Sequence, residues 1–375
     1  MARMADGGRD QGGRDGVKTQ LGTERAGADE RFFGAESERV ALLCQAMADR
    51  FVRGGRLLAV ARSPRGWSDA HHVAVEFVHP VIVGKRALPA MALSPERLAS
   101  LVEPDDMVIA FDPEEDLSAA TERGSLTIAF CPETDADWVF VPSTRDPFVA
   151  QELAETLYHF LWEHVHVFLE HGAQPLRGGG ASSFLYPFLD RQETDPDAVL
   201  ADVRESVLMK AREIAELRAQ TLEDNHDELV AAAEDLKSGR LLALGNGGSA
   251  TDAMDVVADF APRPAIDLTA DSAIITAIAN DIGTEAIFAR QVIAYGREGD
   301  TLLALSTSGN SDNVIAALAE ARRRSIRTIA MVGYDGGRVA AERLADHVIV
   351  TRSEHIPRIQ EAQASAYHVL RELVG

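Results

Sequence analysis

Residues 239–253 read GRLLALGNGGSATDA, and this stretch decides the fold. The short apolar run LLAL is typical of a buried strand, GNGGS follows it directly, and a helical pattern begins near Gly248. Glycine allows the backbone to approach a ligand closely, and N–H groups at a helix start present the positive end of the helix dipole. The stretch therefore predicts a strand, loop and helix that bind an anion.

A second loop of the same kind is STSGNSDN, at residues 306–313, after the apolar run Thr301–Leu305. Parallel strands bring such loops together at their carboxyl ends, where ligands bind. Two loops of this kind favour an anion site over capped turns. The hydroxyl donors that these loops offer are Ser249, Ser306, Thr307, Ser308 and Ser311.

Short apolar runs alternate with helical patterns, which predicts an α/β fold with a doubly wound parallel sheet covered by helices on both faces. The expected strands around the two loops are Arg240–Leu244, Ala265–Leu268, Thr301–Leu305, Thr328–Val332 and His347–Val350.

The first part of the chain resembles the second, which indicates an internal duplication and two such units. Five matches in the same order are hard to obtain by chance between unrelated domains. The matched pairs are Gly55–Val60 with Gly239–Leu244, Ser68–Phe77 with Thr251–Phe260, Asp106–Phe111 with Asp300–Leu305, Thr127–Phe130 with Thr328–Met331, and Asp137–His159 with Asp346–His368.

The composition is that of a globular chain of 375 residues, enough for two domains of roughly 150–200 residues each. Lys and Arg total 37 against 59 Asp and Glu, so the net charge is −22, which argues against nucleic-acid and anionic-membrane partners. No apolar run of about 18 residues occurs, and the charged start lacks a signal-peptide pattern. With two cysteines, Cys44 and Cys131, we expect a cytoplasmic protein without disulfides.

Composition also suggests the domain boundaries. Residues 1–30 are rich in Gly, Arg and Asp and predict a disordered tail. Residues 31–171 form the first unit, the Gly-rich stretch 172–197 forms a linker, and residues 198–375 form the second unit.

A dinucleotide-binding fold is a competitor. GNGGSA also satisfies G-x-G-x-x-A, and Asp267 follows about twenty residues later, as a ribose-binding acid would. This reading does not account for the hydroxyl-rich second loop. No G-x-x-x-x-G-K-[ST] motif occurs, which argues against a nucleotide-triphosphate loop. We expect no nucleotide cofactor.

Four motifs together resemble the sugar isomerase (SIS) domain: GNGGSATDA, ANDIG at residues 279–283, GREGDTLLALSTSGNSDNVIAAL at residues 296–318, and RIQE at residues 358–361. Among SIS proteins the resemblance is to phosphoheptose isomerases, which convert sedoheptulose 7-phosphate to a heptose 7-phosphate. It covers residues 198–375 strongly and residues 37–171 weakly, through the duplication, so the first unit resembles a degenerate copy.

The resemblance implies roles for individual residues. The sugar-phosphate contacts would be Asn246, Gly247, Gly248, Ser249, Ser306, Thr307, Ser308 and Ser311, with Asn280 and Asp281 on the sugar. The family also has a His-x-x-x-Glu pair after its first loop and a Gln-x7-His pair on its last helix, which supply a metal site and the acid and base groups.

The two units divide these features between them. The second unit keeps the loops and the pair Gln360 and His368, but has Asp255 and Asp259 where the family has His and Glu. The first unit lacks both loops: SPRGWSD replaces the glycines, and DPEED at residues 112–116 replaces STSGN, where acidic groups would repel a phosphate. It keeps the family's residue types at His72, Glu76, Gln151 and His159.

These residues give the expected metal site, for zinc or another divalent ion, as His72, Glu76, Gln151 and His159, with Asp255, Asp259, Gln360 and His368 as the alternative set. The expected catalytic groups are Asp259, His368, Glu76 and His159, and Gln360 would contact substrate. Gln151 and His159 are two turns apart, about 12 Å along a helix axis, so they meet one substrate only if it spans both turns or if helices of both units converge.

The sequence therefore predicts an aldose–ketose isomerase that acts on a sugar phosphate through an enediol, with the phosphate in the second unit and catalytic groups shared across an interface. The alternatives are a non-catalytic sugar-phosphate-binding regulatory or assembly protein and, third, a nicotinamide-dinucleotide enzyme. The resemblance implies that single-unit phosphoheptose isomerases assemble as tetramers. A duplicated chain could supply two of the four units of such a tetramer, so we expect a homodimer.

Overall fold

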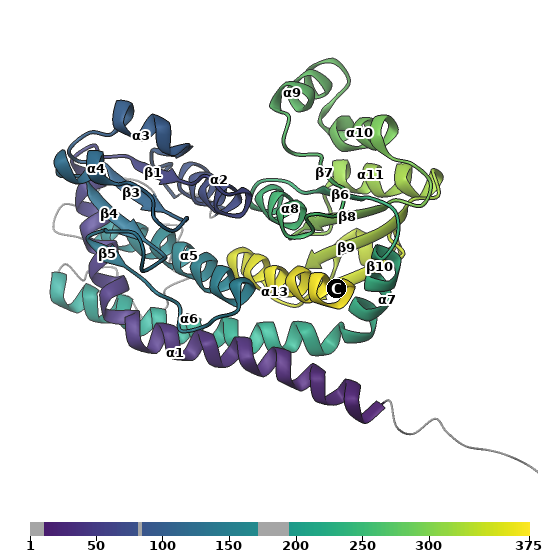
Figure 1. The fold of residues 1–375 in the computed structure, drawn as a ribbon, viewed down its shortest axis with the longest axis horizontal. Coiled ribbons are helices and arrows are strands. Elements are labelled where there is room, and N and C mark those ends of the chain that lie inside the picture. Colours follow the sequence, from purple (N-terminus) through teal and green to yellow (C-terminus); the bar gives the residue numbers. More distant parts are fainter. Residues whose placement is uncertain (1–10, 82–84, 172–194) are drawn as a thin grey trace, which may run out of the picture.

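The computed structural model describes residues 11–81, 85–171 and 195–375, and within these ranges the side chains from residue 24 onward. Within these residues the chain forms two parallel sheets of five strands each (Figure 1). The first contains β1 Leu57–Val60, β2 Ala90–Leu93, β3 Met107–Ala110, β4 Leu126–Ala129 and β5 Trp138–Val139. The second contains β6 Leu241–Leu244, β7 Ala265–Asp267, β8 Thr301–Ser306, β9 Arg327–Gly333 and β10 His347–Thr351.

Both sheets have the same topology. The spatial order is β2-β1-β3-β4-β5 in the first and, reading from the other edge, β7-β6-β8-β9-β10 in the second. Every neighbouring pair is parallel, for example Leu58 opposite Val108 and Leu242 opposite Leu302. The predicted doubly wound α/β fold and its two-unit arrangement are confirmed, and the five predicted strands of the second sheet are present with no end shifted by more than one residue.

Helices cover both faces of each sheet, because every central strand alternates apolar side chains between two cores. On the first sheet, one core packs against α1 Gln11–Val52, α2 Pro64–Val78 and α5 Pro147–His171, and the other against α3 Pro95–Leu101 and α4 Ser118–Glu122.

The second sheet repeats the plan. One face packs against α7 His226–Leu236, α8 Gly248–Asp259 and α13 Ile356–Val374. The other packs against α10 Ile287–Tyr295, α11 Asp312–Arg323 and α12 Gly337–Ala341, with α9 Ser272–Asp281 and the short η1 Thr284–Ala286 nearby.

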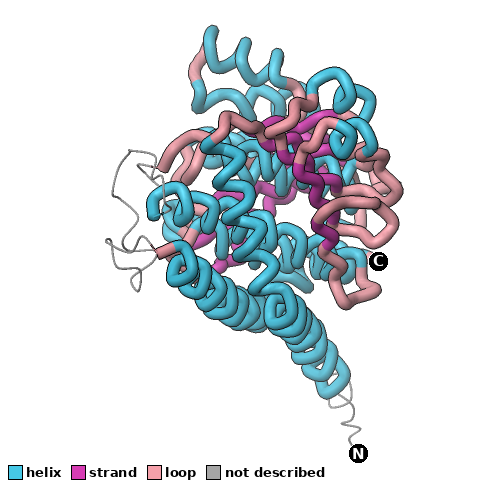
Figure 2. Tube along the Cα trace, turned by 90° about the vertical axis from the view of Figure 1, so that its left-hand side faces the viewer, coloured by secondary structure: helices cyan, strands magenta, loops and turns pink. Residues whose placement is uncertain are grey.

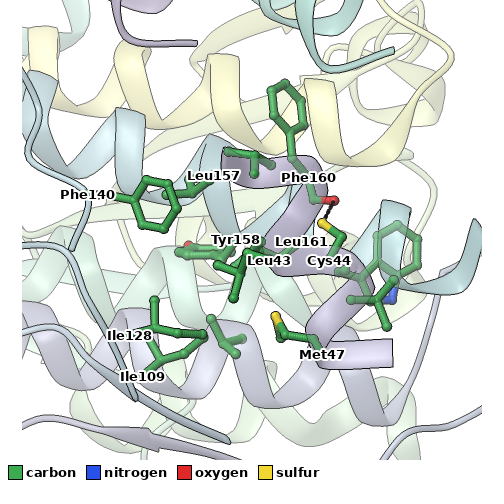
Figure 3. Close-up of a cluster of buried hydrophobic side chains, with 14 of the residues drawn as sticks. Leu43, Cys44, Met47, Ile109, Ile128, Phe140, Leu157, Tyr158, Phe160 and Leu161 are labelled. Atoms are coloured by element: carbon green, nitrogen blue, oxygen red, sulfur yellow. Dashed lines mark hydrogen bonds between the residues drawn. The ribbon is translucent and has the colours of Figure 1, made fainter. Parts of the chain in front are cut away.

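Helices α5, α6 Pro196–Asp224 and α13 join the two units. Helices α1 and α6 run side by side along one edge of the molecule, and α13 lies against α5 and α6 (Figures 1 and 2). Figure 3 shows the core of the first unit, where Leu43 and Met47 of α1 meet Ile109, Ile128 and the apolar face of α5 around Leu157.

The predicted disordered tail is wrong where the chain can be described. Helix α1 begins at Gln11, and Ala28 and Asp29 are buried. The charges that suggested disorder are partnered across the fold, since Arg25 pairs with Glu152 at 3.0 Å and Asp29 pairs with Arg218. Residues 1–10 and most of the predicted linker, residues 172–194, lie outside the described residues.

The sheets and their surrounding helices fall within the predicted limits of residues 31–171 and 198–375, although α1 and α6 begin before those limits. In the described part of the chain, no helix is both long and apolar enough to span a membrane.

Candidate active site

The first candidate loop connects β6 to α8 at the position where the strand order of the second sheet reverses, between β6 and β8. Gly247 has φ +59°, which favours glycine. Gly248 opens α8, and a Cβ at this position would lie 2.0 Å from Gln360 Nε2 and 3.0 Å from His72 Nε2. The loop therefore lies directly against Gln360 of α13 and His72 of the first unit, and a glycine is required at position 248 for this approach.

The second candidate loop follows β8 at the same edge. The Ser306 hydroxyl accepts from the Gly309 amide at 3.2 Å, and the Ser308 hydroxyl accepts from the Asn310 amide at 3.2 Å. Ser311 occupies the N-cap of α11 without a side-chain capping bond. These hydroxyls lie at a strand-to-helix turn, as the sequence predicted.

The two loops are joined to one another. The side-chain amides of Asn246 and Asn313 exchange two hydrogen bonds of 2.9 Å each. The buried Ser249 lies at the start of α8, and the Thr307 carbonyl accepts from the Gly333 amide at 3.0 Å. Asn313, which the sequence analysis did not single out, helps to hold the loops in register.

Asn280 and Asp281 are at the exposed end of α9, and their side chains bond to each other at 2.7 Å. None of the residues in α9 is buried, and the helix stands out from the body of the second unit (Figure 1). Among the described residues, neither side chain forms a hydrogen bond to the two loops, so the structure does not join them to the site.

A buried polar cluster lies beside Gly248, where α2, α5 and α13 meet. His72 Nε2 is 3.3 Å from His159 Nε2 and 3.3 Å from Gln360 Nε2. His159 Nδ1 is 2.8 Å from Glu361 Oε1. Helices of both units therefore converge here, and His72 and His159 of the first unit face the glycine loop of the second.

Glu155 belongs to this cluster although the sequence analysis missed it. Ligand atoms of His72, Glu155 and His159 all lie within 4.8 Å of one another, and all three residues are buried. Glu155 is one turn before His159 on α5, and this i, i+4 spacing is the signal that could have revealed it. Burial, with the nearby Asp252 and Glu361 carboxylates, raises the pKa of Glu155 well above its ordinary value.

Glu76 and Gln151 are not part of this group. Gln151 Nε2 donates to Asp255 Oδ1 at 2.8 Å, so the two glutamines have exchanged units: Gln151 faces the second unit's aspartates and Gln360 faces the first unit's histidine. The Oε2 atom of Glu76 is buried and has no partner among the described residues. Burial and the Glu163 and Glu361 carboxylates raise the pKa of Glu76 to about 8.

The second cluster contains Asp255, Asp259 and His368, whose ligand atoms also lie within 4.8 Å of one another. His368 Nε2 is 3.2 Å from Asp259 Oδ2 and 3.7 Å from Asp255 Oδ2. Arg65 of the first unit donates to Asp259 Oδ1 through Nε at 3.0 Å, and the Tyr367 hydroxyl donates to Asp255 Oδ2 at 2.9 Å. Protein groups thus bond to both oxygens of Asp255 and to Asp259 Oδ1, while Asp259 Oδ2 lies beside His368.

The two clusters differ in the protonation of their histidines. Burial and Arg358 lower the pKa of His159 to about 3, which keeps its imidazole neutral. Burial alone would lower the pKa of His368, but the carboxylates of Asp255, Asp259 and Glu152 outweigh it and raise that pKa well above its ordinary value. The cluster around His159 can therefore offer neutral imidazole nitrogens, whereas the carboxylates around His368 favour its protonated form.

Taken together, two doubly wound sheets of equal topology, with two hydroxyl- and glycine-rich loops at one switch point, define a tandem α/β fold with a candidate anion-binding site. The chain belongs to the SIS domain family. The family model of the SIS domain matches residues 205–333.

Curated relatives carry a consistent name. The chain is 39% identical over 185 residues to a phosphoheptose isomerase of Nitratidesulfovibrio vulgaris, covering 46% of this chain and 88% of the relative. It is 44% identical over 146 residues to a phosphoheptose isomerase of Pelobacter propionicus, covering 37% of this chain and 76% of the relative.

Solved structures extend the likeness to both units as a matter of fold. The C-terminal domain of a glucosamine-fructose-6-phosphate aminotransferase from Francisella tularensis aligns with a TM-score of 0.58 at 12% identity, covering 92% of this chain and 95% of that chain. A tagatose-6-phosphate ketose/aldose isomerase from Escherichia coli aligns with a TM-score of 0.57 at 13% identity, covering 95% and 93%.

Proposed function

We propose that this chain is a sugar-phosphate isomerase of the phosphoheptose isomerase type, which interconverts sedoheptulose 7-phosphate and an aldoheptose 7-phosphate. The curated relatives bearing that name support the reaction class. The sugar-phosphate loops of the second unit support the substrate class.

The phosphate binds at the two loops. Backbone N–H groups at the start of α8 and the hydroxyls of Ser249, Ser306, Ser308 and Ser311 supply local hydrogen-bond donors for a phosphate ester, although the chain as a whole carries a net charge of −22. The bond between Asn246 and Asn313 holds the loops at a fixed separation, so the donors are organised before substrate arrives.

The remaining groups come from the first unit, and one observation carries this part of the proposal: the approach of His72 Nε2 to Gly248. A phosphate on the glycine loop would place the adjoining sugar next to His72, His159 and Gln360. The catalytic site is thus a hybrid, with the clamp from one unit and the histidines from the other.

Isomerisation moves a proton between C1 and C2 and a second proton between the two oxygens, through an enediol. Glu76 lies one turn after His72 on α2, and its Oε2 atom has no partner among the described residues. Its pKa of about 8 lies close to neutral pH, which suits a group that takes up and returns a proton. We assign the carbon-to-carbon transfer to Glu76. We assign His72 and His159 to the sugar oxygens, because both histidines lie in the cluster beside Gly248.

A divalent metal fits this cluster. Two neutral imidazole nitrogens and a carboxylate converge within 4.8 Å, and the buried Glu155 Oε1 and Gln360 Oε1 atoms have no partner among the described residues. We propose His72, Glu155, His159 and Gln360 as ligands for zinc or a similar ion, in place of the set with Glu76 and Gln151. When bound, such an ion polarises a substrate carbonyl or hydroxyl.

The alternative set, Asp255, Asp259, Gln360 and His368, fits a metal poorly. Asp259 already accepts from Arg65, His368 would have to lose the proton that its carboxylate neighbours favour, and Gln360 faces His72. For the same reasons Asp259 and His368 are weaker candidates for catalytic groups than Glu76 and His159. Metal analysis of protein purified without a His tag tests the assignment: zinc retained by wild type and lost in His72→Ala/His159→Ala, but kept in His71→Ala, would support it.

The proposed activity is tested by incubating the protein with sedoheptulose 7-phosphate and measuring the aldose formed. Binding of the sugar phosphate without conversion would favour the non-catalytic regulatory alternative. Calorimetry with a nicotinamide dinucleotide tests the third reading. Asp267, its expected ribose acid, already accepts from the Thr269 amide at 2.7 Å and the Thr269 hydroxyl at 2.5 Å.

A further inference from the structure

The first sheet has its own switch point, between β1 and β3, and this is the position equivalent to the phosphate loops. The matched strands align Arg62 and Ser63 with Asn246 and Gly247, and Asp112 with Ser306. The first unit therefore presents a helix start, that of α2, next to the residue that follows β3.

Asp112 fills the space between these elements. Its Oδ2 atom accepts from the Arg62 amide at 2.5 Å and from the Ser63 amide at 2.7 Å, and its Oδ1 atom bonds to the Ser63 hydroxyl. The side chain is buried, and a Cβ at Gly66 would lie only 2.7 Å from Asp112 Oδ1. One carboxylate thus takes two backbone amides and a hydroxyl, a donor set that would suit a phosphate.

The second unit differs at the same positions. The amides of Asn246 and Gly247 have no acceptor among the residues that the structure describes, and Ser306 is too short to reach them as Asp112 reaches its partners. The backbone amides that donate to Asp112 in the first unit therefore have counterparts in the second unit that are available to a ligand.

The sugar side of the first unit's site is filled as well. In the register of Ser68 with Thr251, Arg65 stands where the second unit has Gly248. Its guanidinium bonds to Asp259 and lies 5.1 Å from the centre of the Phe148 ring. Where Gly248 leaves room for His72 and Gln360, Arg65 closes the equivalent space.

The cavity that remains in front of Asp112 has a volume of about 680 Å³ and an acidic lining that includes Glu96, Glu114, Glu115 and Asp116. Arg62 in this lining is paired with Glu96. A free anion approaching the first unit therefore meets four carboxylates before it reaches the amides.

We propose that the Asp112 carboxylate occupies the phosphate position of the first unit. Of the two equivalent sites in each chain, the one in the second unit is then open to a ligand, and the one in the first unit is filled by a side chain of the protein. The identity of the ligand at the open site rests on the proposed function. The occupation of the closed site by Asp112 does not, since it concerns the first unit alone.

Rescue by an external anion tests this. The melting temperatures of wild type, Asp112→Ala and Asp112→Ser are measured in phosphate and in chloride of equal ionic strength. In chloride we expect both variants to melt roughly 2–6 °C below wild type, because two partly buried backbone amides lose the carboxylate that accepts from them. Phosphate should restore more than half of this loss, beyond any increase that it produces in wild type.

Asp112→Asn is the matched control, because its side chain still fills the position and its phosphate response should equal that of wild type. Phosphate binding at the second unit's loops should raise the melting temperature of wild type and of every variant alike, so it cancels in the comparison. The result can therefore be interpreted even if the proposed function is wrong. Unchanged melting of Asp112→Ala and Asp112→Ser in chloride, or a phosphate response no larger than in wild type, would overturn the proposal. Should Asp112→Ala fail to fold, Asp112→Ser, which carries the residue type of Ser306, gives the same comparison.

Discussion

His159 of α5 and Glu361 of α13 share a hydrogen bond of 2.8 Å, although 202 residues separate them. The equivalent contact joins His368 to Glu152 at 2.9 Å. Each unit's last helix thus carries a glutamate that holds the other unit's histidine. At the hybrid site, the Glu361 carboxylate accepts from the Nδ1–H group of His159. The lone pair of His159 Nε2 then faces His72.

Removal of this support should impair catalysis more than it impairs folding. We expect Glu361→Ala to lower kcat by roughly 10–100-fold, as loss of a partner that orients a histidine does. Glu361→Gln, whose carbonyl can still accept from Nδ1–H, should recover most of that loss. Steady-state kinetics alongside melting temperatures check this. Equal kcat values for the Ala and Gln variants would contradict it.

The phosphate clamp predicts a specific loss of affinity. Each charge-assisted bond contributes roughly 1.5–3 kcal/mol, so Ser308→Ala should weaken sugar-phosphate binding about tenfold to a hundredfold. Ser100→Ala, at an exposed serine of α3, is the control and should bind as wild type does. Calorimetric titration measures both. If Ser308→Ala binds as tightly as wild type, the position of the phosphate is wrong.

Glu76 predicts a pH dependence of stability. Its pKa is raised from 4.5 to about 8 in the folded chain, so between these values the folded state keeps a proton that the unfolded state releases. Stability therefore falls as pH rises from about 4.5 to 8. Glu76→Gln retains the neutral form and should exceed wild type in free energy of unfolding by roughly 1–3 kcal/mol at pH 8.

The same variant should differ little from wild type at pH 5, where the wild-type carboxyl is protonated in the folded chain. Denaturant titrations at the two pH values give the comparison. An advantage of equal size at pH 5 and pH 8 would show that the effect is not one of ionisation.

The chain is expected to form a homodimer. Ile282, just after α9, is 54% exposed, and we expect it to lie in the dimer interface. Light scattering should give about 81 kDa, twice the chain mass of 40.5 kDa. Ile282→Asp should shift this value towards the monomer. A wild-type mass of 40.5 kDa at micromolar concentration would rule the dimer out.

The sequence predicted the sheets and both loops because these depend on local patterns: short apolar strands, glycines with positive φ, and hydroxyls at helix starts. It also placed the catalytic groups at an interface, but left open whether one substrate spans two turns of a helix or helices of the two units converge. Contacts between helices distant in the chain could not be read in the same way. The exchange of Gln151 and Gln360 between units, and the place of Glu155 beside His159, depend on how α5 and α13 cross.

Composition gave a wrong prediction for the first 30 residues of the chain. Gly, Arg and Asp suggested disorder for residues 1–30, yet Arg25 and Asp29 are buried because each has a charged partner on α5 or α6. Likewise, DPEED read only as a repulsive replacement for STSGN, whereas the first of its acids is an acceptor for the α2 amides. The sign of a charge was evident in the sequence, but its partner was not.

The most direct test of the hybrid site is the turnover of sedoheptulose 7-phosphate by wild type, His72→Gln and His368→Gln, each shown to fold by its melting temperature. The account predicts that wild type converts the sugar, that His72→Gln loses at least about a hundredfold in kcat/KM, or roughly 2.7 kcal/mol of transition-state stabilisation, and that His368→Gln loses less. Full activity in His72→Gln, or a wild type that binds the sugar phosphate without converting it, would contradict the account.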